Sequence, residues 1–446
     1  MQTSMKGQFV FAVLSIFLPL SSIEGQVDLF VIAAGNPGFG YRPVIDGNLV
    51  VWQRHPDRAV DPFGLGTIES RDITRLDLPV ETIANFNANI GGLFLSRDYL
   101  FWGGSSLSYV WGRPRTALDG GNDILVAKFG RVVGATRDFV VIKGSSWEFK
   151  DAHKNRYFAK SFSRIADQGD DAFIEIAQYR SEAWSYHVEA VSDEYLVWQD
   201  RDPSIEAETW KIYAKKVSSR MNLDEASLVI DSKAGTQQVG NSGVLLAVRR
   251  NMILYQGAER EEEGSPLALY LHDMYRNDPP ALLEVFATTQ DPYIERRMGS
   301  PSLSSDYAVW RESEFDGKVR FTFRARARRI IDGEPIGQNF TIADISADRI
   351  MIDGNLAVWN DTRVEDGDFV TSSIVVAELP GTRGVGDVNQ DGQIDLSDPI
   401  VILSYLFLGG WQPRRRLADF DQNGGIELTD ALSIIEYLFF GGKGPG

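Results

Sequence analysis

One short phrase recurs along most of this chain and restricts its fold more than any other sequence feature. Each copy is a polar turn followed by an apolar run that ends in a large side chain. Two weaker copies end at Ile142 and Tyr255, and the strong copies end at Trp52, Trp102, Trp198, Trp310 and Trp359. The steps between successive ends are 50, 40, 56, 57, 55 and 49 residues. A period in this range is typical of repeated supersecondary units.

These repeats predict a β-propeller. Val44–Trp52 and Val191–Trp198 each place Asp, Gly, Asn or Ser in a turn before a β-branched and aromatic run, which is the pattern of a turn followed by a strand. Helical periodicity is scarce before residue 380, and four short strands per unit, repeated radially, make a propeller blade. The expected fold is mainly β: a propeller of about seven blades over residues 26–380, with six or eight left open, followed by a small α-helical domain over 381–446.

The repeats resemble the TolB-like and cell-surface propeller families. The resemblance is carried by Trp198-Gln199-Asp200-Arg201 and Trp359-Asn360-Asp361-Thr362-Arg363, which follow the turn-and-strand phrase. Trp310-Arg311-Glu312 and Trp102-Gly103-Gly104 depart from the family pattern. The resemblance covers most of residues 40–380. It implies a fold, and a fold alone says little about function.

The last 60 residues contain one 24-residue unit twice, offset by 32 residues and identical at 12 pairs. The copies open with Asp387–Asp398 and Asp419–Asp430, loops with oxygen donors at positions 1, 3 and 5 and Gly at position 6. Each loop runs directly into an apolar helix, predicted over Ser397–Leu408 and Thr429–Phe440. Calcium binds six to eight oxygens around such a tight loop. Pro380 and the glycines after it rule out an entering helix, so each unit is expected to be a loop followed by one helix.

We therefore expect about two calcium ions, one in each loop. The candidate ligands are Asp387, Asn389, Asp391, the Gln393 carbonyl, Asp395 and Asp398 in the first loop, and Asp419, Asp421, Asn423, the Gly425 carbonyl, Glu427 and Asp430 in the second. Asp395 and Glu427 are expected to act through water. Without metal the like charges repel, and calcium is predicted to fold the module. Ile394 and Ile426 are expected to pair, and Ile402, Tyr405 and Leu406 to share a core with Ile434, Tyr437 and Leu438.

The loop-then-helix pair resembles the dockerin family, specifically the dockerin type I repeats, over roughly Gly386–Gly442. Two complete loops, Asp at loop position 12 and a duplicated Tyr-Leu-Phe-x-Gly-Gly tail carry this resemblance. It implies a double half-EF-hand that binds calcium and docks onto a cohesin-like protein. In dockerins, loop positions 10 and 11 help to choose the partner, and here they are Leu396-Ser397 and Leu428-Thr429. The alternative is that calcium only folds the module and nothing docks.

Composition excludes several classes of function. A formal net charge of −17 argues against nucleic acid and anionic membranes as partners. The absence of Cys excludes disulfides, thiolate metal sites and a Cys nucleophile. Residues 1–25 have the features of a secretory signal peptide, with Lys6 before the apolar run Phe9–Leu20, which is too short to span a bilayer. No later segment is long and apolar enough to span one. The sequence predicts a secreted protein, extracellular or at the cell surface.

Two functions fit the sequence. The first is a propeller that binds a ligand, with polysaccharide as one class, tethered by the calcium module. The alternative is a polysaccharide-degrading enzyme, an O-glycosyl hydrolase or polysaccharide lyase carried on the propeller. No Gly-x-Ser-x-Gly elbow or phosphate-binding loop is present, so catalytic residues are unknown and enzymatic activity is undecided. His187, just before a predicted blade strand, is the candidate general base, although a structural role is expected.

Aromatic and basic residues are the candidates for ligand contact. The five phrase tryptophans are expected to pack between blades rather than to bind a sugar. The four tryptophans outside the phrase are candidates for exposed contacts: Trp111, Trp147, Trp184 and Trp411. The Arg320–Arg329 segment holds five arginines, mostly alternating, which predicts one solvated strand face, with contact to an anionic glycan as the sharper hypothesis.

Overall fold

The structure is a computed structural model that describes most of the chain after the predicted signal peptide. The described residues are 27–36, 40–54, 66–86, 90–104, 109–118, 120–144, 156–178, 189–201, 210–218, 228–230, 246–258, 267–276, 278–286, 296–315, 321–331, 333–345, 349–365, 368–380, 385–389, 394–410, 413, 415–421, 423 and 425–442. The signal-peptide prediction for residues 1–25 lies outside them.

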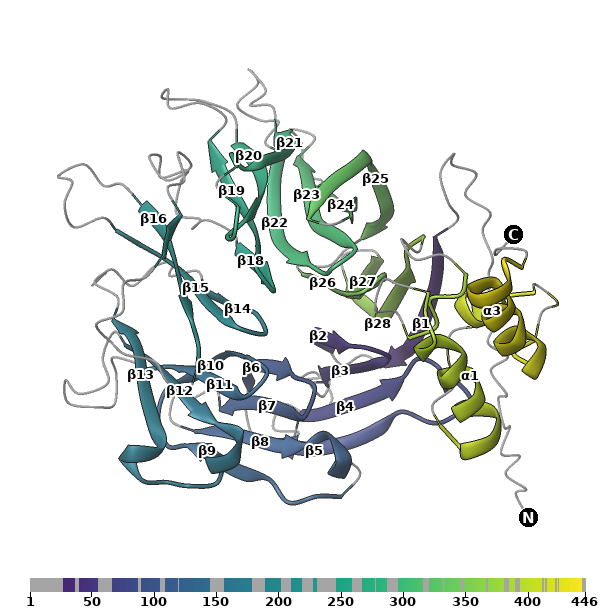
Figure 1. The fold of residues 1–446 in the computed structure, drawn as a ribbon. Helices are drawn as coiled ribbons and strands as arrows, with labels where there is room; N and C mark the ends of the chain where they lie inside the picture. The colour runs from purple at the N-terminus through teal and green to yellow at the C-terminus, as the bar shows by residue number, and fades with distance from the viewer. Residues whose placement is uncertain are drawn as a thin grey trace, which may run out of the picture.

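Within these residues, 28 strands form seven four-stranded antiparallel sheets around a common centre (Figure 1). Blade 1 is β2 (Gly40–Asp46), β3 (Leu49–Arg54), β4 (Gly66–Asp72) and β5 (Glu81–Phe86), and blade 2 is β6 (Ile90–Leu95), β7 (Tyr99–Gly104), β8 (Val110–Pro114) and β9 (Ile124–Ala127). Blade 3 is β10 (Arg131–Ala135), β11 (Phe139–Lys143), β12 (Arg156–Ser161) and β13 (Phe173–Gln178), and blade 4 is β14 (Glu189–Val191), β15 (Tyr195–Arg201), β16 (Trp210–Lys216) and β17 (Leu228–Ile230). Blade 5 is β18 (Leu246–Arg249), β19 (Met252–Ala258), β20 (Leu267–Asp273) and β21 (Ala281–Phe286), and blade 6 is β22 (Arg296–Leu303), β23 (Tyr307–Phe315), β24 (Phe321–Ile331) and β25 (Glu334–Ile345). Blade 7 is β26 (Ile350–Asp353), β27 (Leu356–Glu365), β28 (Asp368–Glu378) and β1 (Asp28–Asn36).

The seven recurring phrases correspond one to one with the seven blades. Every phrase ends in the second strand of a different sheet, from Trp52 in β3 to Trp359 in β27. The predicted mainly-β propeller is therefore confirmed, and its blade number is seven. The first strands of neighbouring blades contact one another all the way around the ring, so they line its centre.

The large side chains that end the phrases fill the seams between blades. Trp310 packs against Leu254 and Leu269 of blade 5, and Trp52 packs against Leu356 of blade 7. None of the five phrase tryptophans is more than 5% exposed. Burying a side chain of this size stabilises a seam by about 2–3 kcal/mol. The expectation that these tryptophans are core residues is confirmed, and it removes them as sugar platforms.

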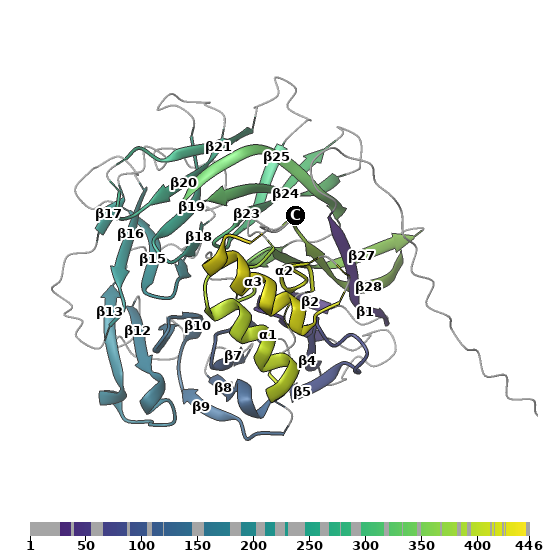
Figure 2. The ribbon, with the colours of Figure 1, turned by 45° about the vertical axis from the view of Figure 1, so that its right-hand side comes forward.

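Blade 7 closes the ring with a strand from the other end of the propeller. β1 forms the outer strand of this blade and pairs antiparallel with β28, with Asp28 opposite Glu378 and Ala33 opposite Ile374. Figure 2 shows the purple β1 lying beside the green β28. The first strand of the chain therefore bridges blade 7 and blade 1, although it carries no copy of the phrase.

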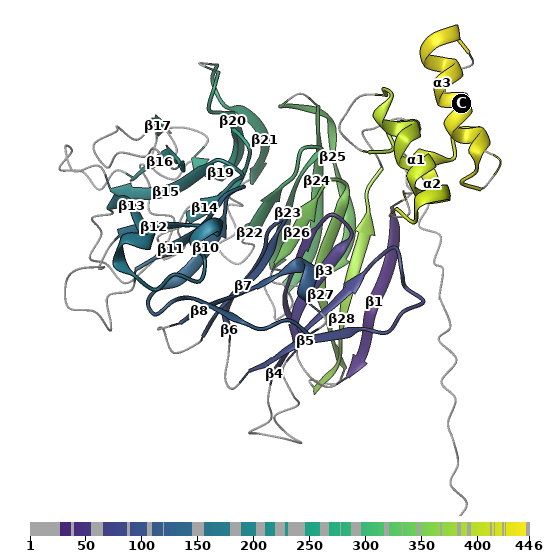
Figure 3. The same ribbon diagram turned by 60° about the horizontal axis from the view of Figure 1, so that its bottom comes forward.

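The C-terminal module is helical and lies to one side of the ring (Figure 3). Its helices are α1 (Ser397–Leu408), α2 (Arg415–Ala418) and α3 (Leu428–Phe440). The prediction for α1 is confirmed to the residue, whereas α3 begins one residue earlier than predicted because Glu427 forms its N-terminal cap. Single 3₁₀ turns lie in the propeller at Arg115–Ala117, Phe162–Arg164 and Asp170–Ala172. No helix among the described residues has the length and apolar character needed to cross a membrane.

The two halves of the module share one apolar core. Ile402 and Ile434 are fully buried in it, and their predicted partners Leu406, Leu438, Ile394 and Ile426 pack around them. The tyrosines depart from the prediction: neither Tyr405 nor Tyr437 belongs to this core, and Tyr437 is 38% exposed with its ring 6.0 Å from that of Phe420. Phe420 occupies the core instead. It approaches Gly386 so closely that a Cβ there would lie 2.8 Å from its ring, which requires glycine.

Candidate metal centre

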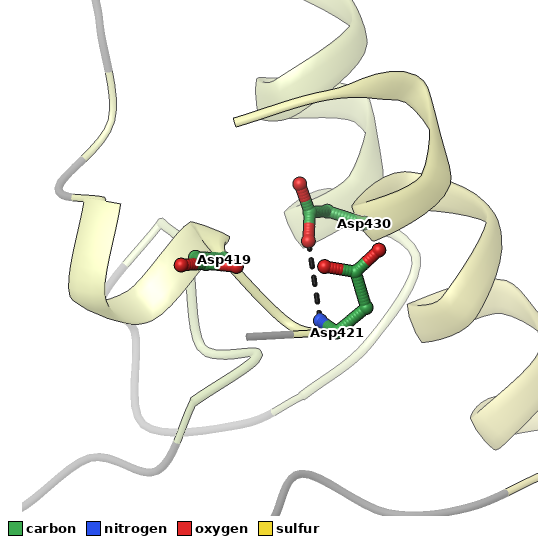
Figure 4. Close-up of side chains that lie close together, drawn as sticks. All are labelled: Asp419, Asp421 and Asp430. Carbon is green, nitrogen blue, oxygen red and sulfur yellow. Dashed lines mark hydrogen bonds between the residues drawn. The ribbon is translucent and has the colours of Figure 1, made fainter. Parts of the chain in front are cut away.

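The second acidic loop gathers three carboxylates at one point. Oxygen atoms of Asp419, Asp421 and Asp430 lie within 4.8 Å of one another, and Figure 4 shows the three side chains around this point. They occupy loop positions 1, 3 and 12. The loop and the first turn of α3 thus bring together residues that are 11 positions apart in sequence.

Asp430 organises this loop through backbone amides. Its carboxylate is completely buried and accepts hydrogen bonds from the N–H of Asp421 at 3.2 Å and of Glu427 at 2.8 Å. The Glu427 side chain in turn caps the Asp430 N–H, which makes a reciprocal capping box at the start of α3. Burial raises the pKa of the Asp430 carboxyl, and the charge of Asp421 adds to this against the lowering effect of the amides. A bound cation would favour the ionised form.

The first loop repeats this arrangement around Asp398. Its carboxylate is also completely buried and accepts from the N–H groups of Val388 at 2.6 Å, Asn389 at 3.0 Å and Asp395 at 2.8 Å. Asp387, at loop position 1, is 2% exposed. The position-12 carboxylate therefore has the same structural role in both loops, and the internal repeat seen in the sequence is also a repeat in space.

The remaining candidate ligands are placed less uniformly. Asp395 is exposed and accepts from both the N–H and the hydroxyl of Ser397, which lower the pKa of its carboxyl, the hydroxyl more than the amide. Asn389 donates to the Ser397 hydroxyl. In the second loop the Asn423 carbonyl accepts from the N–H of Gly425 at 2.9 Å, and Asn423 Nδ2 donates to Asp421. Asp391 and Gln393 lie outside the described residues.

This donor set has the chemistry of a hard-cation site. Each loop contains four acidic side chains and no Lys, Arg, His or Cys. Oxygen-only sites select calcium or magnesium over zinc and copper, and a flexible loop of this size suits calcium. Asp398 and Asp430 are held by neutral amide dipoles, which leave the negative charge of each loop uncompensated by its own residues. The acidic cluster at residues 419–430 fits calcium on these grounds.

A family model matches the same segment of the chain. The model of the dockerin type I domain covers residues 385–439, which include both loops, α1 and all but the last residue of α3. Residues 385–439 are a dockerin type I domain. The resemblance drawn from the two Asp-rich loops is confirmed. Domains of this type bind calcium and occur in extracellular or cell-surface proteins, where they attach to cohesins.

Several solved structures are similar to this chain over about three quarters of its length. The β-propeller domain of the trilobed protease from Pyrococcus furiosus has 15% identity and a TM-score of 0.46, covering 75% of this chain and 97% of that one. Pyrococcus horikoshii acylaminoacyl peptidase has 12% identity and a TM-score of 0.45, covering 75% of this chain and 52% of that one. Kluyveromyces lactis Hsv2 has 10% identity and a TM-score of 0.41, covering 76% and 98%. No curated protein matches the chain. Similarity at this level supports no conclusion about function.

The described residues give no support to the candidates for glycan contact. Trp111 is half-buried in β8 opposite Trp102 and packs against the seam between blades 1 and 2, so it is not the exposed aromatic expected. Trp147, Trp184, Trp411, His187 and Arg320 lie outside the described residues. Among the residues that the structure describes, none of these candidates supports a polysaccharide ligand or the enzyme alternative.

Two arginines of strand β24 have polar partners in blade 6 and at blade 5, whereas Arg324 is 37% exposed beside the exposed Asp344. Arg326 donates to Thr341 and lies 3.6 Å from Glu312 and 4.0 Å from Glu284 of blade 5. Arg328 donates to Asn339, which itself bonds to blade 5. The fully solvated face expected from the alternation is wrong for these two residues, because carboxylates and the Asn339 amide cover them in part.

Proposed function

We propose that the dockerin tethers this protein to a cohesin-bearing partner outside the cell, and that the propeller is the module held there. The observation that supports the proposal is the paired loop geometry, in which Asp398 and Asp430 fix two equivalent oxygen-rich loops on one shared core. In this proposal cations bind the two loops and stabilise the module, and the module performs no reaction.

We propose two calcium ions, one for each loop. The first is assigned to Asp387, Asn389, Asp391 and Asp398 with the Gln393 carbonyl, and the second to Asp419, Asp421, Asn423 and Asp430 with the Gly425 carbonyl. Asp395 and Glu427 are assigned to water-mediated contacts. The convergence of Asp419, Asp421 and Asp430 supports the second set, and the matched burial of Asp387 and Asp398 supports the first.

The docking surface that we propose is apolar and present in two copies. Leu396 and Leu428, at loop position 10, are 49% and 44% exposed, and one turn further Ile400 and Leu432 are 61% and 53% exposed. Each pair is related by the repeat offset of 32 residues. The neighbouring position-11 residues differ, because Ser397 is hydrogen-bonded into its loop whereas Thr429 is exposed. Exposed apolar side chains at equivalent positions favour a partner that can bind in two orientations.

Binding of purified type I cohesin domains to the full-length chain tests the tethering. We expect binding in millimolar calcium and its loss in excess chelator. Leu396→Gln with Ile400→Gln removes one copy of the surface, and Leu428→Gln with Leu432→Gln removes the other. Either pair alone should change the affinity by less than about tenfold, or about 1.4 kcal/mol, while all four changes together should abolish binding.

The outcomes separate the parts of this proposal. Complete loss of binding from one pair alone would contradict two equivalent orientations while leaving the tether in place. Calcium binding without affinity for any cohesin would overturn the tether and leave calcium with a purely structural role.

For the propeller we propose ligand binding without chemistry, and a panel of neutral and anionic polysaccharides tests it. Binding without release of reducing sugar or unsaturated product is the expected result. Turnover of any member of the panel that His187→Ala abolishes would overturn this proposal and establish a hydrolase or lyase.

A further inference from the structure

The third strand of every blade makes the same backbone hydrogen bond at its end, and this bond identifies one equivalent position in each of the seven blades. Two residues after this position, the backbone N–H donates to the turn between the first and second strands, as from Ile73 to the Asn48 carbonyl at 2.9 Å and from Leu379 to the Asn355 carbonyl at 2.8 Å. From blade 1 to blade 7, the matched residues are Arg71, Arg113, Lys160, Lys215, His272, Arg328 and Ala377. Six of the seven are basic residue types, which indicates a shared role.

The outer strand of six blades supplies the acceptor for this role. Each of these strands has a register shift that leaves one extra residue, and each extra residue is at most 7% exposed: Ile32, Ile83, Val126, Ile176, Leu283 and Ile342. A β-bulge leaves its extra residue out of the ladder, so its carbonyl is available to another donor. Between Leu228 and Ile230, the described outer strand of blade 4 shows no such shift.

Four of the six basic side chains reach bulged carbonyls across the seams, three of them directly. Lys160 donates to the Val126 carbonyl of blade 2 at 2.5 Å, and Arg113 donates to the Ile83 carbonyl of blade 1. In blade 6 the contact is relayed, because Arg328 donates to Asn339, and Asn339 donates to the Leu283 carbonyl of blade 5 at 2.9 Å. Each contact joins one blade to the blade before it, and we call such a contact a strap. A charged donor makes a hydrogen bond about twice as strong as a neutral one.

The strap of Arg71 differs because of the strand it holds. Arg71 donates to the Ile32 carbonyl in β1 at 2.5 Å and also to the Leu76 and Leu78 carbonyls. The chain connects β1 directly to β2 of blade 1, but β1 meets the rest of blade 7 only through its pairing with β28. Leu29, Phe30 and Val31 are 48%, 37% and 57% exposed, so β1 buries little apolar surface before Ile32, which is completely buried. Ile32 anchors the strand through its side chain and, by way of Arg71, through its carbonyl.

We propose that Arg71 is the latch of the propeller ring. It fixes the closing strand β1 on blade 1 in the position where β1 pairs with β28, so its loss weakens that pairing while the six other seams stay closed. The propeller would then open at one defined place, since no covalent connection runs across the junction between β1 and β28.

Hydrogen exchange on the full-length chain tests the latch, with Arg71→Met compared with Arg113→Met. Both variants remove one strap and keep the length of the side chain. In Arg71→Met we expect amide exchange in β1 and β28 to become at least tenfold faster, with blades 2 to 6 unchanged. In Arg113→Met the faster exchange should appear in β5 and β8, and β1 should remain protected.

Arg71→Lys sharpens the test and also serves if Arg71→Met does not fold. Lys160 shows that a lysine at this matched position reaches a bulged carbonyl, so Arg71→Lys should keep the protection of β1 within about threefold of wild type. The latch is overturned if β1 in Arg71→Met exchanges as in wild type, if exchange rises equally in all seven blades, or if Arg71→Lys frees β1 as completely as methionine does.

Discussion

The propeller and the dockerin both bury carboxylates, but they compensate the negative charge in opposite ways. In the propeller, the Glu189 side chain is 5% exposed and bonds to Arg131 and to Lys143 at 2.9 Å. In the dockerin, the completely buried Asp430 is held by the backbone N–H groups of Asp421 and Glu427. A guanidinium or ammonium carries a full charge, whereas an amide carries only a dipole. The propeller therefore brings its own counter-charges, whereas the dockerin loops contain no basic residue, and the proposed calcium ions would supply that charge.

This contrast predicts that only one of the two modules responds to calcium. Removing calcium from the full-length chain with a chelator should unfold α1 and α3 and leave all seven blades protected in hydrogen exchange. Each site contributes about 2.7 kcal/mol when free calcium is about a hundred times its Kd, so the combined loss is the largest effect expected. Calorimetry should show about two ions per chain. A propeller that loosens together with the helices would break the comparison, as would an absence of binding at millimolar calcium.

The reverse perturbation should affect the propeller alone. Trp310 is completely buried in the seam between blades 5 and 6. Trp310→Ala should lower the free energy of unfolding of the propeller by about 3–5 kcal/mol, because it leaves a cavity in a packed seam. Urea unfolding measures the change, and calorimetry should show unaltered calcium binding. Trp111→Ala, at a half-buried tryptophan, is the matched control and should cost clearly less. Loss of calcium binding in Trp310→Ala would show that the modules fold as one unit.

Within the dockerin, the position-12 aspartates test whether the halves depend on each other. Asp398→Ala or Asp430→Ala removes the acceptor of the loop amides and a metal ligand, and should destabilise the module by about 3 kcal/mol in calcium. Because Ile402 and Ile434 share one core, either change should speed amide exchange in both α1 and α3. Asp395→Ala, at an exposed position, is the control and should have a smaller effect. Faster exchange in one helix only would show two independent halves.

The sequence predicted features that depend on contacts between residues close together in the chain, and missed those that depend on distant residues. The loops and their helices are local, so the spacing of Asp387, Gly392 and Asp398 is enough to predict a loop that leads directly into a helix. The blades are also local: seven phrases predicted about seven blades, with six or eight left open, and the structure has seven. The closing strand β1 escaped prediction because its partner β28 lies at the far end of the propeller, and no phrase marks it.

Side-chain partners across the seams were equally hidden from the sequence. The alternating arginines of β24 were expected to face water, but Arg326 and Arg328 are within reach of Glu284 and Asn339. Strand periodicity predicts which side chains share a face, but not whether solvent or a neighbouring blade covers it. Likewise, the straps depend on a bulge in one blade and a basic residue in the next, and the local sequence shows neither the bulge nor which basic residue reaches it.

The smallest change in the free energy of unfolding is expected from Lys160. Its contribution measures the destabilisation that comes from burying a cation in the propeller. Lys160 is completely buried, and burial lowers its pKa from the ordinary 10.5 to about 8, against the opposing charge of Asp167. Between pH 8 and 10.5 the unfolded chain therefore binds the Lys160 proton more tightly than the native protein does. The free energy of unfolding should rise with pH across this window, by on the order of 2 kcal/mol from this group. Urea unfolding at several pH values, compared with Lys160→Met, isolates the contribution, because the variant lacks the proton but keeps the other groups that titrate there. Parallel pH profiles for the two proteins would mean that Lys160 keeps its ordinary pKa in the fold. Burial of this ammonium group would then not weaken its hold on the proton.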